Sequence, residues 1–139
     1  MSFRNGSYES SGFDNWMTPQ HLVDDLRDEF GELYDPCPRN PTIDGLSIDW
    51  PTDRPCFVNP PYSEMAAWTA KCREQWERGC LVILLIPPRT DTRYFHANVA
   101  GSATVRFLKG RLKFVHPENG EGKTAPFPSI LCIYERVSA

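Results

Sequence analysis

The sequence lacks the features that would mark a membrane, secreted or repeat protein. No apolar stretch is long enough to span a bilayer, and the polar segment from Met1 to Asn15 has no signal-peptide pattern. There is no internal repeat and no low-complexity segment. These absences predict a soluble cytoplasmic protein that does not act at a membrane. Residues 1–15 are expected to form a flexible arm.

Cysteine usage also fits neither a disulfide framework nor a zinc site. The chain has five cysteines, an odd number, and none of them has CxxC spacing. Three lie in apolar runs or on the apolar face of an expected helix, which favours buried free thiols in a reducing compartment. We therefore expect no bound metal. The cysteines are Cys37, Cys56, Cys72, Cys80 and Cys132.

Length and composition indicate one globular domain. The chain has 139 residues, which is enough for a real core, and we expect residues 16–139 to form a single domain. The hydrophobic share of 40% and the charged share of 24% are those of a soluble protein. A net charge of −3 argues against a general nucleic-acid binder.

The low net charge hides an asymmetry between the two parts of the chain. Residues 1–53 hold eleven acids and three bases, whereas residues 54–139 hold twelve bases and seven acids. Between Arg89 and Phe114 there are six bases against one acid, Asp91. One face could therefore contact phosphate, with a solvated charged surface as the alternative. The six bases are Arg89, Arg93, Arg106, Lys109, Arg111 and Lys113.

The first part of the chain predicts one helix followed by loops. Apolar residues spaced along one face predict a helix over 19–30, with Thr18 as N-cap, Pro19 in the first turn and Gly31 at the stop. Leu33-Tyr34 predicts a short strand that ends at an acid, Asp35. Residues 38–55 are rich in proline and leave room for one brief strand within 43–50, but not for a regular βαβ crossover.

The second part alternates strands and helices, which predicts an α/β fold. The run at 80–86 is apolar throughout, as in a strand buried on both faces. Residues 116–126 are Gly-rich and polar, which predicts a mobile loop. The other expected elements are strands at 56–58, 104–108, 112–115 and 130–134, and helices at 63–78 and 92–99.

The tetrapeptide Asn59-Pro60-Pro61-Tyr62 stands between the strand at 56–58 and the next helix. Ligands bind in α/β sheets at such strand ends. The two prolines stiffen the loop and remove two N–H donors, so the loop offers mainly carbonyl acceptors. Asn59 adds a side-chain carbonyl, and Tyr62 adds an aromatic face. The alternative is a plain turn whose Asn caps the following helix.

Such a loop suits one chemical task, methylation of a poorly nucleophilic amine. The lone pair of an aryl amine is delocalised into the ring, so the nitrogen attacks an electrophile slowly. Two acceptors draw this nitrogen toward tetrahedral geometry as positive charge develops, which stabilises the transition state more than the ground state. No strong base is then required.

Further motifs accompany this loop in a fixed order along the chain. They are Trp16-Met17-Thr18-Pro19, Tyr34-Asp35-Pro36, Asp44-Gly45-Leu46 before Asp49-Trp50, Phe57-Val58-Asn59-Pro60-Pro61-Tyr62-Ser63, Arg89-Thr90-Asp91-Thr92, Gly110-Arg111-Leu112-Lys113-Phe114 and Phe127-Pro128-Ser129. Together they resemble the phage DNA adenine methyltransferase family (Dam-like), and they cover nearly everything after residue 15.

The resemblance implies a minimal Rossmann-like methyltransferase sheet with a shortened cofactor half and an antiparallel C-terminal strand. It implies S-adenosylmethionine as cofactor and methyl transfer to the amino nitrogen of a flipped adenine in DNA, in a host cytoplasm if the chain is phage-encoded. A flipped base costs a few kcal/mol of unstacking, which aromatic stacking on Tyr62 would offset. The implied catalytic residues are Asn59, Pro60, Pro61 and Tyr62.

The resemblance also implies two sets of binding residues. Thr18 and Asp35 are expected at the cofactor, and either Asp44 or Asp49 at its ribose. Phe127 is expected opposite Tyr62, against the base. The cofactor set is Trp16, Thr18, Pro19, Asp35, Pro36, Asp44 and Asp49, and the DNA set is Arg89, Arg93, Arg111, Lys113 and Phe127.

The chain departs from the general methyltransferase pattern in its first half. No Gly-x-Gly loop follows Asp35, and only 23 residues separate Asp35 from Asn59. A complete cofactor half does not fit into this length, and the chain has no room for a separate recognition domain.

Four alternative functions share some of these features. The same loop chemistry would serve a glutamine-amide methyltransferase, although the basic run favours nucleic acid, and cytosine is a conceivable target base. A nucleic-acid-binding relative without catalysis would explain the shortened cofactor half, but the complete loop opposes it. Carbon methylation by Cys56 is disfavoured, because Pro55-Cys56 leads into an apolar strand.

Overall fold

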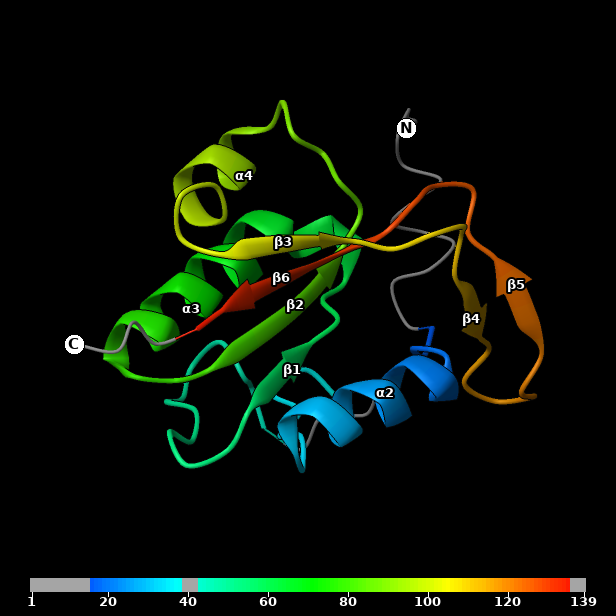
Figure 1. Cartoon of the computed structure of the whole chain (residues 1–139), viewed down its shortest axis with the longest axis horizontal. Helices are drawn as coiled ribbons and strands as arrows, with labels where there is room; N and C mark the ends of the chain where they lie inside the picture. The colour runs from blue at the N-terminus through cyan, green and yellow to red at the C-terminus, as the bar shows by residue number, and fades with distance from the viewer. Residues whose placement is uncertain (1–15, 39–42, 136–139) are drawn as a thin grey trace.

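The computed structural model describes residues 16–38 and 43–135 and has a mixed α/β architecture (Figure 1). The arm predicted for residues 1–15 lies outside the described residues. The main sheet of the described structure has four strands in the order β1-β2-β6-β3. The strands are β1 (Cys56–Val58), β2 (Val82–Ile86), β3 (Thr104–Phe107) and β6 (Ile130–Tyr134).

The sheet is mixed because its last strand runs against the others. β1 and β2 are parallel, whereas β6 is antiparallel to both of its neighbours, β2 and β3. The antiparallel C-terminal strand is thereby confirmed. Tyr34 makes a single parallel bridge to Cys56, so the predicted strand at 33–34 is reduced to one bridging residue beside β1.

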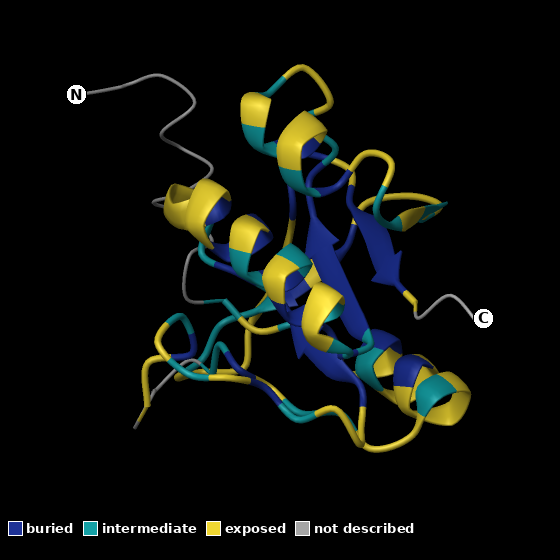
Figure 2. Cartoon of the chain, turned by 90° about the vertical axis from the view of Figure 1, so that its left-hand side faces the viewer, coloured by how far each residue is buried: buried dark blue, intermediate teal, exposed yellow. Residues whose placement is uncertain are grey.

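Alternate residues of the central strands belong to two separate hydrophobic cores, because successive side chains of a strand point to opposite faces of the sheet. One core joins the sheet to α3 (Met65–Arg78) and α4 (Arg93–Asn98), and the other joins it to α2 (Gln20–Phe30). β2 is buried along its whole length, as its apolar run predicted. The helices cover the sheet in Figure 2.

The two helices of the first half end and begin close to the predicted positions. α2 ends before Gly31, and α3 ends at Gly79, which has a φ of 117° that favours glycine. The helix expected from residue 63 begins as a 3₁₀ turn, η1 (Tyr62–Glu64), and continues as α3. Thr92 caps α4, since its side chain accepts a hydrogen bond from the Phe95 N–H.

The N-cap assigned to Thr18 is wrong. The N-cap of α2 is Pro19, which makes no side-chain capping bond, and its carbonyl accepts the N–H groups of Leu22 and Val23. The Thr18 hydroxyl instead accepts a hydrogen bond from the side chain of Asn59. A long-range partner therefore replaces the local capping role.

The strand expected within residues 43–50 is absent; this segment forms turns. Side chains satisfy its backbone in place of a strand ladder. Gln75 of α3 accepts the Trp50 N–H at 2.8 Å, and Arg78 donates to the Trp50 carbonyl at 2.7 Å. The Trp50 indole in turn donates to the Gly45 carbonyl at 2.9 Å. The loop is thus fixed to α3.

The loop predicted at 116–126 is also partly wrong, because it contains a strand. β5 (Gly122–Thr124) pairs antiparallel with β4 (Lys113–Val115) in a separate two-stranded sheet. Met17 pairs with Val115 on the other side of β4. Phe114 is buried in the α2 core, which holds this hairpin against the main sheet. The residues of β5 are all exposed and include no apolar side chain, so no hydrophobic pattern marks this strand in the sequence.

The cysteines are free thiols, as predicted, and four of the five are buried. Among the described residues, no helix is long and apolar enough to cross a membrane. The same residues contain no cluster of His, Cys, Asp and Glu suited to a metal ion.

Candidate active site

The Asn-Pro-Pro-Tyr loop leaves the carboxyl end of β1 and leads directly into η1. Pro60 is buried, whereas Asn59, Pro61 and Tyr62 are partly exposed. The Pro61 carbonyl accepts the Glu64 N–H at 3.0 Å, which starts the 3₁₀ turn. Because β1 and β2 are parallel, this loop and the loop after β2 lie at the same edge of the sheet (Figure 1).

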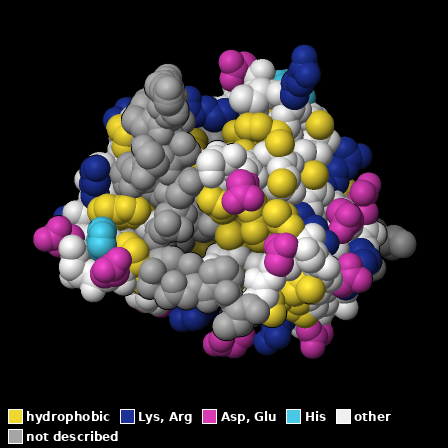
Figure 3. Space-filling model, turned by 180° about the vertical axis from the view of Figure 1, so that it is seen from behind, with side chains coloured by type: hydrophobic (Ala, Val, Ile, Leu, Met, Phe, Trp, Pro, Cys, Tyr) yellow, Lys and Arg dark blue, Asp and Glu magenta, His cyan; other side chains and the backbone are white. Residues whose placement is uncertain are grey.

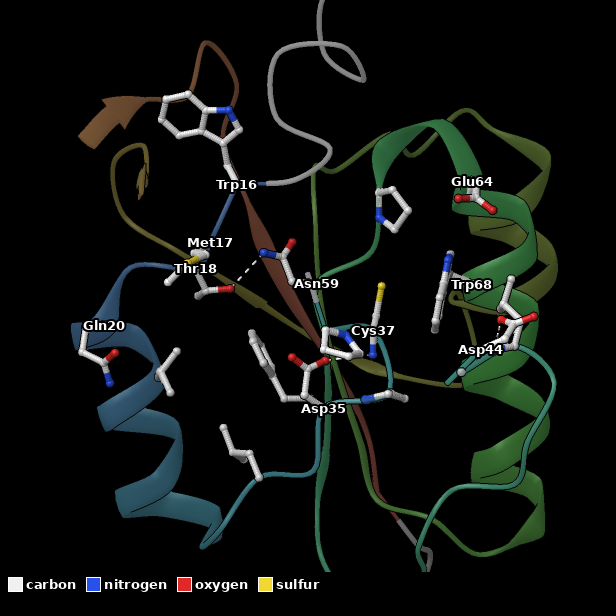
Figure 4. Close-up of a pocket in the computed structure, with 18 of the residues that line it drawn as sticks. Trp16, Met17, Thr18, Gln20, Asp35, Cys37, Asp44, Asn59, Glu64 and Trp68 are labelled. Atoms are coloured by element: carbon white, nitrogen blue, oxygen red, sulfur yellow. Dashed lines mark hydrogen bonds between the residues drawn. The ribbon is translucent and has the colours of Figure 1, made fainter. Parts of the chain in front are cut away.

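A cavity of about 500 Å³ opens beside this loop, within the size range of small-molecule sites. Asn59 lies between two walls, one from the start of α2 and one from α3 and the loop at 44–46, with Asp35 below (Figure 4). The lining includes Trp16, Met17, Thr18, Gln20, Arg27, Asp35, Pro36, Cys37, Asp44, Gly45, Leu46, Asn59, Glu64 and Trp68.

One hydrogen bond crosses the mouth of the cavity. The Asn59 side-chain nitrogen, Nδ2, donates to Thr18 Oγ1 at 2.9 Å (Figure 4). The two residues are 41 positions apart in sequence, and both line the cavity. This bond turns the other end of the carboxamide, the acceptor Oδ1, away from Thr18.

Two carboxylates of the cavity have different electrostatic surroundings. Asp35 Oδ1 accepts the Cys37 N–H at 2.8 Å, but desolvation in the cavity wall outweighs this bond and raises the pKa of Asp35. Asp44 accepts hydrogen bonds from Ser47 Oγ at 2.7 Å and from the Leu46 N–H at 3.0 Å, and these bonds lower its pKa. A cationic ligand would favour the charged form of both.

Cys37 contributes a thiol to the same cavity. Burial, together with the nearby carboxylates of Asp35 and Glu64, raises its pKa to about 12. The thiol is therefore protonated at neutral pH and presents a weakly polar, unreactive surface.

The floor of the cavity depends on a close approach of two loops. A Cβ on Gly45 would lie 1.8 Å from the Pro36 carbonyl oxygen and 3.0 Å from the Trp68 ring. Only glycine allows the 44–46 loop to touch the 35–38 loop at this point. Trp68 also stacks on Trp50, with ring centroids 6.4 Å apart, which supports the wall behind Gly45.

Most residues of the predicted cofactor set lie together. Trp16, Thr18, Asp35, Pro36 and Asp44 all line the cavity.

Two members of the set lie elsewhere. Pro19 is buried and is not part of the lining. Asp49 also lies outside the lining; it accepts a hydrogen bond from Gln75 at 3.1 Å and forms an ion pair with Arg78 at 3.3 Å. Of the two acids proposed for a ribose, only Asp44 lies at the cavity.

Sequence patterns did not reveal four polar or aromatic residues of the lining. Gln20 and Arg27 lie on α2, and Glu64 and Trp68 lie at the start of α3. The helical spacing predicted that Trp68 is a core residue, and Trp68 is indeed buried in the α3 core. The same side chain also lines the cavity. Gln20 and Arg27 line the cavity because α2 packs on the sheet beside β1, and the sequence does not indicate this packing.

The aromatic pair predicted to hold a base lies at the expected edge. The rings of Tyr62 and Phe127 are in contact, edge to face, with centroids 5.3 Å apart and an interplanar angle of 79°. Phe127 is buried in the α2 core, whereas Tyr62 is partly exposed. Tyr62 is therefore the ring that is accessible for stacking.

The predicted basic run is divided between different elements. Arg89 lies in the loop after β2, Arg93 opens α4, and Arg111 and Lys113 lie at β4. Arg93, Arg111 and Lys113 are exposed.

One base of the run has a protein partner that the sequence did not indicate. Arg106 makes a bidentate ion pair with Glu29 of α2, at 2.6 and 2.7 Å. This pair raises the pKa of Arg106 and lowers that of Glu29. On the face seen in Figure 3, the described acidic and basic side chains are interspersed around a hydrophobic patch. The described side chains on this face do not form a continuous basic surface.

A family model described as DNA N-6-adenine-methyltransferase (Dam) matches residues 7–139. No curated protein and no solved structure matches the chain.

The floor of the cavity yields a stability prediction. We expect Gly45→Ala to lower the free energy of unfolding by more than Gly101→Ala, because only the first added methyl meets backbone atoms. Gly101 has a φ of 79° and open space around it, so its variant measures the cost of the left-handed conformation alone, about 1–2 kcal/mol. Urea unfolding of both variants is the measurement. Equal losses would show that the two loops are not in close contact.

Proposed function

Because the chain belongs to the DNA N-6-adenine-methyltransferase (Dam) family, we propose that it moves a methyl group from S-adenosylmethionine to the amino nitrogen of an adenine in DNA. The observation that carries this proposal is the position of Asn59, an amide acceptor, at the mouth of a cavity of about 500 Å³ lined with acids. The substrate amine and the cofactor would meet at this side chain.

The cavity residues fit the chemical groups of this cofactor. S-adenosylmethionine carries a sulfonium and an ammonium group, for which Asp35 and Glu64 are suitable partners, and ribose hydroxyls, for which Asp44 is suitable. Its carboxylate could pair with Arg27, and its adenine could lie against Trp68. When bound, the cofactor supplies an electrophilic methyl group.

The loop geometry indicates which acceptors hold the target amine. The Pro61 carbonyl already accepts the Glu64 N–H, and Asn59 Nδ2 is directed to Thr18. The two acceptors for the amine are therefore Asn59 Oδ1 and the Pro60 carbonyl. They accept its two N–H groups as positive charge develops on the nitrogen, and the surplus proton then leaves to water.

An adenine paired in duplex DNA cannot reach these acceptors, so we infer that the base is flipped out of the stack. Tyr62 follows the acceptors directly and is partly exposed, which suits it to stack on the flipped base. Phe127 supports the Tyr62 ring from the side. The role of Phe127 in this proposal is to orient Tyr62, in addition to any contact with the base.

The sheet supports a minimal Rossmann-like methyltransferase domain over residues 16–139. Its parallel strands β1 and β2 present their carboxyl ends to the cavity edge, and the antiparallel β6 lies between β2 and β3. Beyond Tyr34, the described residues add no further strand on the cofactor side. The loop at 44–46 and helix α2 close the cavity there.

The methyl-transfer reaction gives the first test. With tritium-labelled S-adenosylmethionine, we expect label in adenine-containing duplexes and none in adenine-free duplexes. Asn59→Ala should lose turnover by about 100-fold or more, because one preorganised acceptor is removed, with little change in cofactor affinity. Calorimetric titration with the cofactor checks that affinity. Equal labelling of both duplexes, or labelling of added protein only, would exclude adenine in DNA as the substrate.

Two exposed bases, Arg111 just before β4 and Lys113 at its start, predict the salt dependence of DNA binding. Each phosphate contact releases condensed counterions, so Arg111→Ala and Lys113→Ala should each reduce the slope of log affinity against log salt by about 0.9. Arg106→Ala is the matched control, since its guanidinium is already paired with Glu29 and should leave the slope unchanged. Salt titrations with a fluorescent duplex measure the slopes. Unchanged slopes for both β4 variants would identify these bases as solvated surface.

The raised pKa of Asp35 predicts how cofactor affinity depends on pH. A cationic cofactor favours the ionised carboxylate, so affinity should be full above the raised pKa of the unliganded protein and fall as pH decreases through it. Asp35→Asn should bind more weakly at neutral pH and lose this dependence. Calorimetry from mildly acidic to neutral pH is the measurement. An identical pH profile in the variant would show that Asp35 does not face the cofactor.

A further inference from the structure

We propose that Thr18 is a positioning residue for catalysis, which holds the Asn59 carboxamide in the one orientation that can accept the target amine. The inference rests on the proposed function and on the hydrogen bond from Asn59 Nδ2 to Thr18 Oγ1. A carboxamide has a donor end and an acceptor end of nearly the same shape. Rotated by 180°, Asn59 would present N–H groups to an amine that also offers N–H groups.

The position of Thr18 is fixed on both sides along the chain. Met17 exchanges two backbone hydrogen bonds with Val115, at 2.8 and 3.0 Å. Pro19 follows Thr18 and restricts it to an extended backbone. The Pro19 carbonyl in turn accepts the N–H groups of Leu22 and Val23 in α2. The hydroxyl therefore lies at a defined point above β1 rather than on a mobile loop.

The direction of the Asn59–Thr18 hydrogen bond, in which Thr18 accepts, has a chemical reason. A hydroxyl has a single O–H donor, so a Thr18 that donates to a ligand in the cavity can only accept from Asn59. Thr18 lines the cavity, and its O–H can serve an acceptor group of the cofactor there. Such a ligand would fix the direction of the bond and thus keep Asn59 Oδ1 toward the amine.

The same segment connects the site to β4, the strand proposed to contact DNA. β4 carries the exposed Lys113, and its residue Val115 pairs with Met17, the neighbour of Thr18. Three consecutive residues, Trp16 to Thr18, thus join β4 to the catalytic amide. Trp16 adds an edge-to-face contact with His116, at a centroid distance of 5.1 Å.

Steady-state kinetics of Thr18→Val and Thr18→Ser test this role. With saturating cofactor and DNA, we expect Thr18→Val to lower kcat by about tenfold or more, less than the loss of a whole preorganised group, and Thr18→Ser to retain most of it. Thr104→Val, an exposed threonine on β3, is the matched control and should keep the wild-type kcat. If Thr18→Val fails to fold, Thr18→Ala replaces it. A normal kcat in the Val or Ala variant, with only the cofactor KM raised, would overturn the inference.

A spectroscopic measurement separates this inference from the proposed function. In ¹⁵N-asparagine-labelled protein, the side-chain amide resonances of Asn59, assigned by Asn59→Asp, should shift in Thr18→Val and keep their positions in Thr18→Ser. Unshifted resonances in Thr18→Val would also overturn the positioning role. Wild-type protein that leaves DNA unmethylated refutes the proposed function instead, and the amide resonances still decide whether Thr18 holds Asn59.

Discussion

The burial of β2 on both faces is the constraint from which the rest of the structure follows. A strand without a solvent face leaves only its ends available for polar chemistry, and its parallel pairing with β1 brings two such ends to one edge. α3 and α4 cover one face, while α2 and the β4–β5 hairpin cover the other. Every polar group proposed for catalysis is therefore concentrated at the carboxyl edge, next to Asn59.

On the cavity side of the sheet, side chains and loops rather than a further strand pair hold the described residues 43–50 in place. Buried Gln75 and the Trp50 indole hold the 43–50 segment by hydrogen bonds that a sheet ladder would otherwise supply. Gly45 then packs on the Pro36 carbonyl without space between them. A small number of specific contacts thus replaces a continuous β-structure, which accounts for a cavity of ligand size in such a short segment.

Local patterns in the sequence predicted the elements that depend on local chemistry. Apolar runs gave β2 and β6, helical spacing gave α2 and α3, and the strand–loop–helix order placed the Asn59 loop at the sheet edge. Apart from the local β4–β5 hairpin, the errors concern contacts between distant segments. The partner of Thr18 is 41 residues away, Arg106 is paired across 77 residues, and Asp49 is bound to α3. No spacing rule reports such pairs, because tertiary packing decides them.

The protonated state of Cys37 bears on the chemical safety of the site. Under the proposed function the cavity would hold an electrophilic methyl group and expose its own walls to alkylation, and a thiolate would be the most nucleophilic group among them. With a pKa of about 12, the thiolate fraction of Cys37 at pH 7 is on the order of 1 in 100,000. Burial, together with the Asp35 and Glu64 carboxylates, thus keeps Cys37 in the thiol form, which is a poor nucleophile toward such a methyl group.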